Sequence, residues 1–244
     1  MKSVYNKIAT KYDERYAASD FSGIESLLSK FYSEKSALEI GCGTGKWLAK
    51  FEGMKVGLDK SHEMLKEARA KKINMLVQAA GEKLPFKNAV FEFVFIVNAV
   101  HFIRDKNSLS REIFRVLKTG GKFILVFADI YEPQYSWYLY DFFPKTKELD
   151  YSRFETTGNL KSILVECGFS NIYVTVAEKV SKTFYGKEVL SDPFLKKHNS
   201  SQLALLTEKE YETGLENIKK EIAINSVYPF KTEIIFKVIS AEKL

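Results

Sequence analysis

Short apolar runs alternate with amphipathic stretches over the first half of the chain. This alternation is typical of a sheet of parallel strands with helices packed on it. The predicted strands cover residues 36–41, 54–59, 74–79, 91–97, 122–129, 171–177 and 232–240. The predicted helices cover residues 45–51, 62–71, 108–117 and 156–167. The run at 91–97 is continuously apolar, which is expected of a central strand that is covered on both faces.

Two segments interrupt this alternation. Residues 130–155 are dense in Tyr, Trp and Phe, and residues 180–229 read as mostly helical. Neither has the composition of a flexible linker. We therefore expect one domain over residues 1–244, with an N-terminal helical part at 1–35, a central part at 36–129, and elaborations at 130–155 and 180–230.

The composition excludes several classes of protein. With 45% apolar and 28% charged residues, the chain is ordinary for a globular protein. The most apolar stretch, 89–103, contains polar residues and is too short to span a bilayer. The N-terminus lacks the apolar core of a signal peptide, and two scattered cysteines have no metal-ligand spacing. We expect a cytoplasmic protein without a metal site.

A net charge of +6 raises the possibility of a nucleic-acid partner. However, lysines carry the excess, and they are spread along the chain beside glutamates. Arginine is the residue favoured for bidentate recognition of phosphate. This pattern therefore favours a solvated Lys/Glu surface over a nucleic-acid face.

A glycine-rich turn, Glu39-Ile-Gly-Cys-Gly-Thr-Gly45, joins the first predicted strand to the first predicted helix. Glycines there permit positive φ and a close approach of the backbone to a ligand. A dinucleotide fingerprint would need a further glycine where this chain has Lys46. Because acidic Glu39 precedes the turn, the pattern favours a ligand with an ammonium and a sulfonium over a pyrophosphate.

This turn, within ALEIGCGTGKW, resembles the first motif of class I S-adenosylmethionine-dependent methyltransferases. The similarity is greatest to the group that includes the ubiquinone- and menaquinone-biosynthesis methyltransferases. Later stretches resemble the family in order and spacing: GLDKSHEML, GEKLPF, FEFVFIVNAVHFIRD, REIFRVLKTGGKFILVF and LVECGFSNI. The resemblance is strong over residues 5–129, weaker over 151–176 and absent over 180–229.

The resemblance implies a Rossmann-like α/β fold with seven mostly parallel strands, helices on both faces and an antiparallel last strand. In this chain, a helical insertion would interrupt the usually tight hairpin before that strand. It also implies an enzyme that converts S-adenosyl-L-methionine to S-adenosyl-L-homocysteine. In this reading, residues 36–129 hold the cofactor, while 1–35 and 180–230 form lids and 130–155 faces the substrate.

The resemblance further implies a set of cofactor-binding residues: Glu39, Gly41, Cys42, Gly43, Gly45, Asp59, Lys60, Met64, Gly81, Glu82, Asn98, Tyr5 and Tyr12. Asp59 would accept hydrogen bonds from the ribose hydroxyls; the alternative is a charge at a helix N-terminus. Ala80 stands where the family commonly has an aspartate, so the adenine amine needs another acceptor. Met64 fits either an adenine contact or the core.

His101 is the candidate general base, because histidine titrates near neutral pH. The competing interpretation is that His101 packs structurally. On the substrate side we expect Tyr16, Tyr131, Trp137 and Tyr140. The aromatic segment fits an acceptor pocket, and it equally fits a hydrophobic lid or a subunit contact, which leaves monomer and homodimer open.

The chemistry expected is an in-line displacement on a small, partly apolar acceptor, accelerated mainly by proximity. The alternatives are a tRNA or rRNA methyltransferase and a non-catalytic interaction protein that keeps the fold. A nicotinamide-dependent oxidoreductase is disfavoured by the glycine spacing. The sequence does not identify the acceptor or its reacting atom, and it leaves open whether a base is used.

Overall fold

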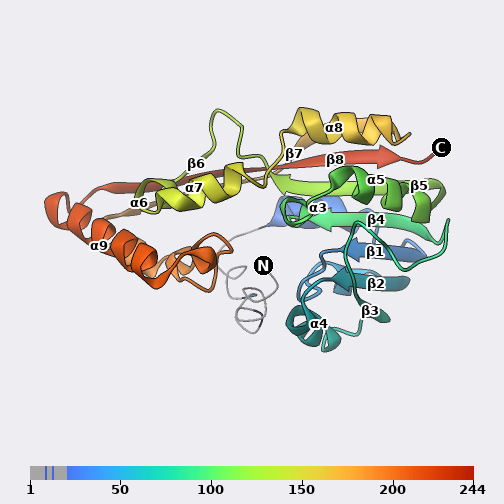
Figure 1. Ribbon diagram of the computed structural model, residues 1–244, viewed down its shortest axis with the longest axis horizontal. Coiled ribbons are helices and arrows are strands. Elements are labelled where there is room, and N and C mark those ends of the chain that lie inside the picture. The colour runs from blue at the N-terminus through green and yellow to red at the C-terminus, as the bar shows by residue number, and fades with distance from the viewer. Residues whose placement is uncertain (1–8, 10–12, 14–20) are drawn as a thin grey trace.

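The computed structural model describes residues 9, 13 and 21–244, and its centre is one mixed sheet of eight strands (Figure 1). Five strands are parallel: β1 (Ser36–Ile40), β2 (Met54–Asp59), β3 (Met75–Gln78), β4 (Phe91–Val97) and β5 (Leu117–Ala128). Three more are joined in antiparallel pairs: β8 (Pro229–Glu242) pairs with β5, and both β6 (Ser136–Trp137) and β7 (Ser170–Tyr185) pair with β8. The order is β3-β2-β1-β4-β5-β8-β6, with β7 on the other edge of β8.

Helices cover both faces of this sheet. The described helices are α3 (Ser22–Ser29), α4 (His62–Arg69), α5 (Lys106–Val116), α6 (Leu139–Phe142), α7 (Pro144–Tyr151), α8 (Thr157–Glu166) and α9 (Glu208–Ile224). The helices α5 and α8 share one apolar core with the sheet, and α3 belongs to a second core on the opposite face. The strand β4 supplies Val94 to the first core and Phe93 to the second, and both are fully buried. The continuous apolar run therefore forms the predicted central strand.

The expected Rossmann-like α/β class is confirmed, and one difference refines it. The sheet has eight strands because the two-residue β6 extends the edge of β8 beyond β5. Ser61 caps α4 as predicted, since its hydroxyl accepts a hydrogen bond from the Met64 N–H at 3.3 Å.

The helix predicted over 45–51 is wrong. Only a 3₁₀ turn forms there, over Leu48–Lys50. The buried carboxylate of Glu39 accepts the N–H of Leu48 at 3.2 Å, and β2 begins only four residues after that turn. A 3₁₀ turn suits such a short connection because it needs only three residues per turn.

The interpretation of residues 180–229 as mostly helical is wrong at its start. The strand β7 continues to Tyr185 and stays paired with β8 until Pro229. Alternate positions at 180, 182 and 184 are half-buried, whereas those between them are exposed, which is the period-two pattern of a strand. The hairpin is therefore lengthened, and its helical tip begins at Gly186.

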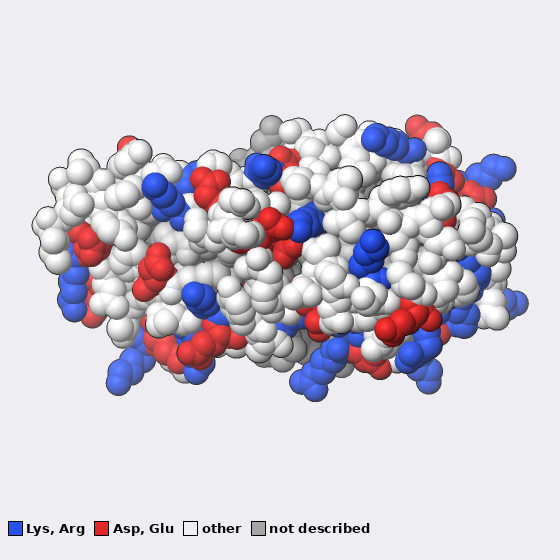
Figure 2. Space-filling model, turned by 90° about the horizontal axis from the view of Figure 1, so that it is seen from above, with Lys and Arg blue, Asp and Glu red and all other residues white. Residues whose placement is uncertain are grey.

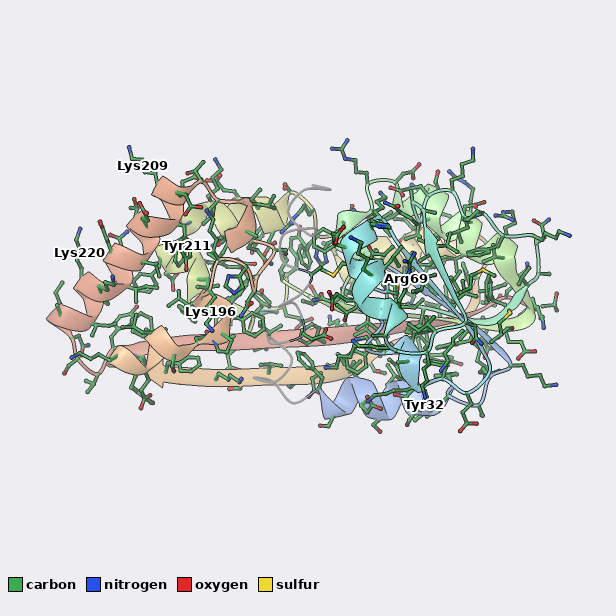
Figure 3. The ribbon with its side chains drawn as sticks, turned by 90° about the horizontal axis from the view of Figure 1, so that it is seen from below. Tyr32, Arg69, Lys196, Lys209, Tyr211 and Lys220 are labelled. Carbon is green, nitrogen blue, oxygen red and sulfur yellow. The ribbon has the colours of Figure 1, made fainter. Side chains whose placement is uncertain are left out.

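The two irregular segments pack together as one unit, which we call the extension: residues 135–151 and 180–230. They share a third apolar core, which joins α6 and α7 to α9 and the turns between β7 and α9 (Figure 1). The contact is close, since a Cβ on Gly214 of α9 would lie 2.1 Å from the Phe143 ring. On α9, the Tyr211 hydroxyl donates to the Leu195 carbonyl at 3.0 Å, while Lys209 and Lys220 point outward (Figure 3).

Surface charges are mixed on the face seen in Figure 2, where basic and acidic side chains are interspersed. Among the described helices, none combines the length and apolarity that a membrane crossing requires.

Candidate functional site

The glycine turn, residues 39–45, leaves the carboxyl end of β1 with a tightly folded backbone. Gly41 and Gly43 have φ of +73° and +52°. A Cβ on Gly41 would lie 2.5 Å from the Cβ of Ala99, which follows β4. Positive φ and this close approach both require glycine at position 41. The turn is thereby held against the exit of the central strand.

Two acidic side chains accept hydrogen bonds from backbone N–H groups in and beside the turn. Asp59 ends β2 and accepts hydrogen bonds from the N–H of Gly43 at 2.9 Å and of Ser61 at 2.8 Å, one on each carboxylate oxygen. Glu39 is almost fully buried and accepts from the Leu48 N–H. Burial raises the pKa of both carboxyls, and the backbone donors oppose that rise.

The buried charge of Glu39 predicts an unusual dependence of stability on pH. Its raised pKa means that its stabilising contribution is complete below pH 4.5, the ordinary pKa, and is lost as pH rises through the folded-state pKa. Glu39→Gln removes the buried charge and keeps an oxygen for Leu48. We expect the free energy of unfolding of the variant to increase relative to that of the parent protein between pH 4 and pH 8. The expected increase is about 1.4 kcal/mol for each pH unit by which burial raises the pKa of Glu39.

Denaturant titrations at a series of pH values test this expectation. Glu92→Gln is the matched control, because Lys118 and other partners lower the pKa of half-buried Glu92. Its stabilisation is present above the ordinary pKa and is lost as pH falls, so the control variant should lose stability relative to the parent at pH 8. If the stability of Glu39→Gln relative to the parent protein fell as pH rises, that result would contradict the raised pKa of Glu39.

A first cavity of about 380 Å³ lies over the glycine turn at the carboxyl ends of β1, β2 and β4. Most of the predicted cofactor-binding residues line it: Glu39, Gly41, Cys42, Gly43, Asp59, Lys60, Met64, Gly81 and Asn98. The volume falls within the range of about 300–1,000 Å³ that is common for small-molecule sites. Burial also raises the pKa of the Cys42 thiol, which is unfavourable for a nucleophile.

Two predicted residues stand outside the wall of the first cavity. Gly45 packs inward, since a Cβ there would lie 2.5 Å from Ile73. Glu82 forms an ion pair with the cavity residue Lys60 at 3.3 Å, and its carboxylate also accepts from the N–H of Arg104. Glu82 therefore holds two residues of the rim rather than lining the space itself.

Asn98 marks the junction with a second cavity. It has φ of +51°, and its N–H donates to the Val126 carbonyl at 2.7 Å. Its side-chain oxygen is buried and has no hydrogen-bond partner among the described residues. The two cavities share four wall residues: Trp47, Val97, Asn98 and Phe102.

The second cavity, of about 110 Å³, lies between this junction and the extension. The inner face of the lengthened hairpin supplies alternate residues of both strands: Val180, Lys182, Phe184, Thr232, Ile234 and Phe236. The turns at the hairpin tip add Asp192, Phe194 and residues 200–202. The insertion thus reaches the second cavity through its strands and turns, while α9 packs against α6 and α7 and lines neither cavity.

The structure places only some of the residues predicted for catalysis and substrate binding at the second cavity. His101 lines the second cavity, where its ring stacks on Phe154 at 4.3 Å between centroids. Trp137 lines it as well. Tyr131 and Tyr140 line neither cavity; their hydroxyls donate to the Phe154 carbonyl and to Asp150. Tyr5, Tyr12 and Tyr16 lie outside the described residues.

Several wall residues had not been predicted from the sequence. Trp47 and Phe102 separate the cavities, and each lies a few residues after a predicted strand. Asp192 precedes Pro193, an Asx-Pro pair that signals a turn but not a cavity. Thr232 and Lys182 follow the period-two pattern of the hairpin, which identifies them only once the pairing of β7 with β8 is known.

The sequence and the fold of this chain are similar to those of known proteins. The profile of the family described as "Methyltransferase domain" matches residues 38–125. An uncharacterized protein of Methanocaldococcus jannaschii is 33% identical over 183 residues, covering 71% of this chain and 84% of that protein. The ubiquinone/menaquinone biosynthesis C-methyltransferase of Klebsiella pneumoniae is 30% identical over 207 residues, covering 69% and 82%. The structure of a methyltransferase from Thermotoga maritima superposes with a TM-score of 0.63 at 18% identity, covering 100% and 99%.

Proposed function

Because the chain belongs to the class I S-adenosylmethionine-dependent methyltransferases, we propose that its second cavity holds the methyl acceptor, a small and partly apolar molecule. The observation that carries this proposal is the shared wall of the two cavities at the exit of β4. A cofactor in the first cavity and an acceptor in the second would meet there. The enzyme uses S-adenosylmethionine and leaves S-adenosylhomocysteine.

The first cavity suits the cofactor in the chemistry of its donors and acceptors. Each oxygen of Asp59 receives one backbone hydrogen bond, so lone pairs remain for the two ribose hydroxyls. The side-chain oxygen of Asn98 has no hydrogen-bond partner in the described part of the chain, and it is the acceptor that we assign to the methionine ammonium. Met64 and Gly81 would border the adenine, with the Lys60–Glu82 pair at the rim. Glu39 would act indirectly, because its hydrogen bond from the Leu48 N–H helps to hold the glycine turn in place.

The cofactor supplies an activated methyl group on a sulfonium. The protein's part is to orient the acceptor and to exclude water, and good orientation alone can contribute about 7–11 kcal/mol. Trp47, Val97 and Phe102 give the junction apolar and aromatic walls. Such walls suit a step in which positive charge is lost from sulfur, because they solvate that charge less well than water.

His101 has two possible roles in this scheme, a general base and a packing ring. Its position in the second cavity fits a base for acceptors that are protonated in the ground state. For such acceptors we expect His101→Asn to lower turnover about 100-fold at pH 7. The measurement is turnover between pH 6 and 9, with Tyr173→Phe as a control at an exposed residue outside both cavities. Turnover that stays at the parental level across this range would leave His101 only its packing role against Phe154.

The acceptor is best sought with a panel of small molecules, read by release of S-adenosylhomocysteine. A cavity of 110 Å³ favours a small molecule over a polymer, and the interspersed charges in Figure 2 give one face no basic patch for nucleic acid. Bulk tRNA is the counter-probe. Salt-sensitive binding of tRNA together with inactivity on every small acceptor would overturn the proposal.

A further inference from the structure

We infer that the methyl acceptor carries an ammonium group, which Asp192 and the aromatic rings of the second cavity bind. This inference rests on the proposed function, in which the second cavity holds the acceptor. It adds the chemical class of the substrate and the side chain that selects it.

Asp192 is a buried carboxylate without an ion-pair partner in the described part of the chain. It lines the second cavity and is 5% exposed. One oxygen accepts from the Tyr138 hydroxyl at 2.7 Å, and the other from the Phe194 N–H at 2.9 Å. A carboxylate offers about four lone-pair sites, so both oxygens can accept further hydrogen bonds. A buried charge is costly unless it is paired, and an ammonium ligand would supply the missing partner.

Aromatic rings stand beside this carboxylate. Trp137 and Phe194 both line the second cavity, with centroids 6.5 Å apart and planes at 84°. Tyr135 and Phe184 also line this cavity. Cations are attracted to the faces of aromatic rings, and aromatic cages are a known means of binding alkylated ammonium groups. A carboxylate among aromatic rings therefore favours an organic cation over a neutral or acidic ligand.

Lys182 is the group in the same cavity that opposes this selection. It is half-buried. Burial raises the pKa of Asp192, and the hydrogen bonds from Tyr138 and Phe194 and the charge of Lys182 oppose that rise. Asp192 is short and is held by two hydrogen bonds. The carboxylate of Asp192 is therefore fixed in position on the cavity wall.

The ammonium and the methyl-accepting atom occupy different parts of the acceptor in this arrangement. Asp192 lines the second cavity alone, whereas Asn98 and Phe102 line both. The ammonium would thus lie on the extension side and the reacting atom at the junction. The cavity of 110 Å³ is smaller than the apolar cavity of about 150 Å³ that holds benzene, so the bound part is short.

Three probes of equal chain length test the charge preference: butylamine, 1-butanol and butyrate. Each is titrated by ligand-observed NMR at pH 7 into the protein saturated with S-adenosylhomocysteine. We expect butylammonium to bind at least ten times more tightly than the alcohol and the acid. Equal affinities would overturn the inference, and so would a preference for butyrate, which would point to Lys182.

Two variants test whether Asp192 causes the preference for butylammonium. Asp192→Asn keeps an oxygen for Tyr138 and removes the charge, so it should weaken butylammonium at least tenfold and leave 1-butanol unchanged. Asp141→Asn removes an exposed carboxylate of α6 that lines neither cavity and should change nothing. Binding of S-adenosylhomocysteine at the parental affinity shows that each variant is folded. An unchanged preference in Asp192→Asn would overturn the inference independently of the first experiment.

A cavity-filling variant separates this inference from the proposed function. Thr232 is buried and lines only the second cavity, so Thr232→Phe should abolish binding of all three probes and preserve that of S-adenosylhomocysteine. Probes that still bind to this variant lie elsewhere, which would contradict the acceptor site itself. Loss of binding in Thr232→Phe without any charge preference would contradict only the ammonium inference.

Discussion

Replacing Gly41 with alanine is expected to destabilise the protein by about 3 kcal/mol and to abolish measurable binding of S-adenosylhomocysteine. The new Cβ would occupy a backbone with φ of +73° and would lie 2.5 Å from the Cβ of Ala99. Either the turn or the exit of β4 would have to move, and both line the first cavity. Chemical denaturation gives the loss of stability, and titration calorimetry gives the loss of affinity.

Gly120 offers a matched control for backbone strain. Its φ is +76°, but a Cβ there would meet nothing within 4 Å. Gly120→Ala should therefore cost only the strain of a left-handed residue, about 1–2 kcal/mol, and leave binding unchanged. Adding Ala99→Gly to Gly41→Ala removes the steric contact and should recover part of the binding. Equal effects of Gly41→Ala and Gly120→Ala would show that the close approach to Ala99 does not matter.

Replacing Asp59 with alanine should weaken S-adenosylhomocysteine about 100-fold or more, because two kinds of interaction are lost together. The backbone N–H groups of Gly43 and Ser61 would lose their acceptor, and the proposed bonds to the ribose would be absent. We expect the loss to appear as a higher dissociation constant in calorimetry. An affinity within threefold of the parent would rule out a ribose role for Asp59.

Asp105 separates this effect from the general loss of a carboxylate. It caps α5 through the Ser108 N–H at 2.8 Å and lines neither cavity. Asp105→Ala should cost about 1 kcal/mol of stability, the usual value for a lost helix cap, and leave cofactor affinity unchanged. Asp59→Asn adds a finer comparison, because one of its two backbone donors would then face an NH₂ group.

The elements of the sheet were predictable where the local pattern has a single interpretation. The apolar run at 91–97 could be covered on both faces only at the centre of a sheet, and β4 lies there. The stretch 45–51 was assigned wrongly, since apolar spacing does not reveal that the Glu39 side chain accepts the Leu48 N–H. The start of 180–229 was also assigned wrongly, because its alternation becomes decisive only when β8 is known to be its partner.

The glycine turn and Asp59 could be identified from the sequence by itself. The conformation of the turn and the position of Asp59 depend on residues that are close in the chain or that end adjacent strands. The spacing of these residues along the sequence is therefore enough to predict them. The second cavity was decided only by the tertiary structure. Asn98, Trp137, Asp192 and Thr232 come from separate parts of the chain, and no local pattern links them. They meet because the lengthened hairpin carries the extension beside the exit of β4, and such packing depends on contacts between distant segments.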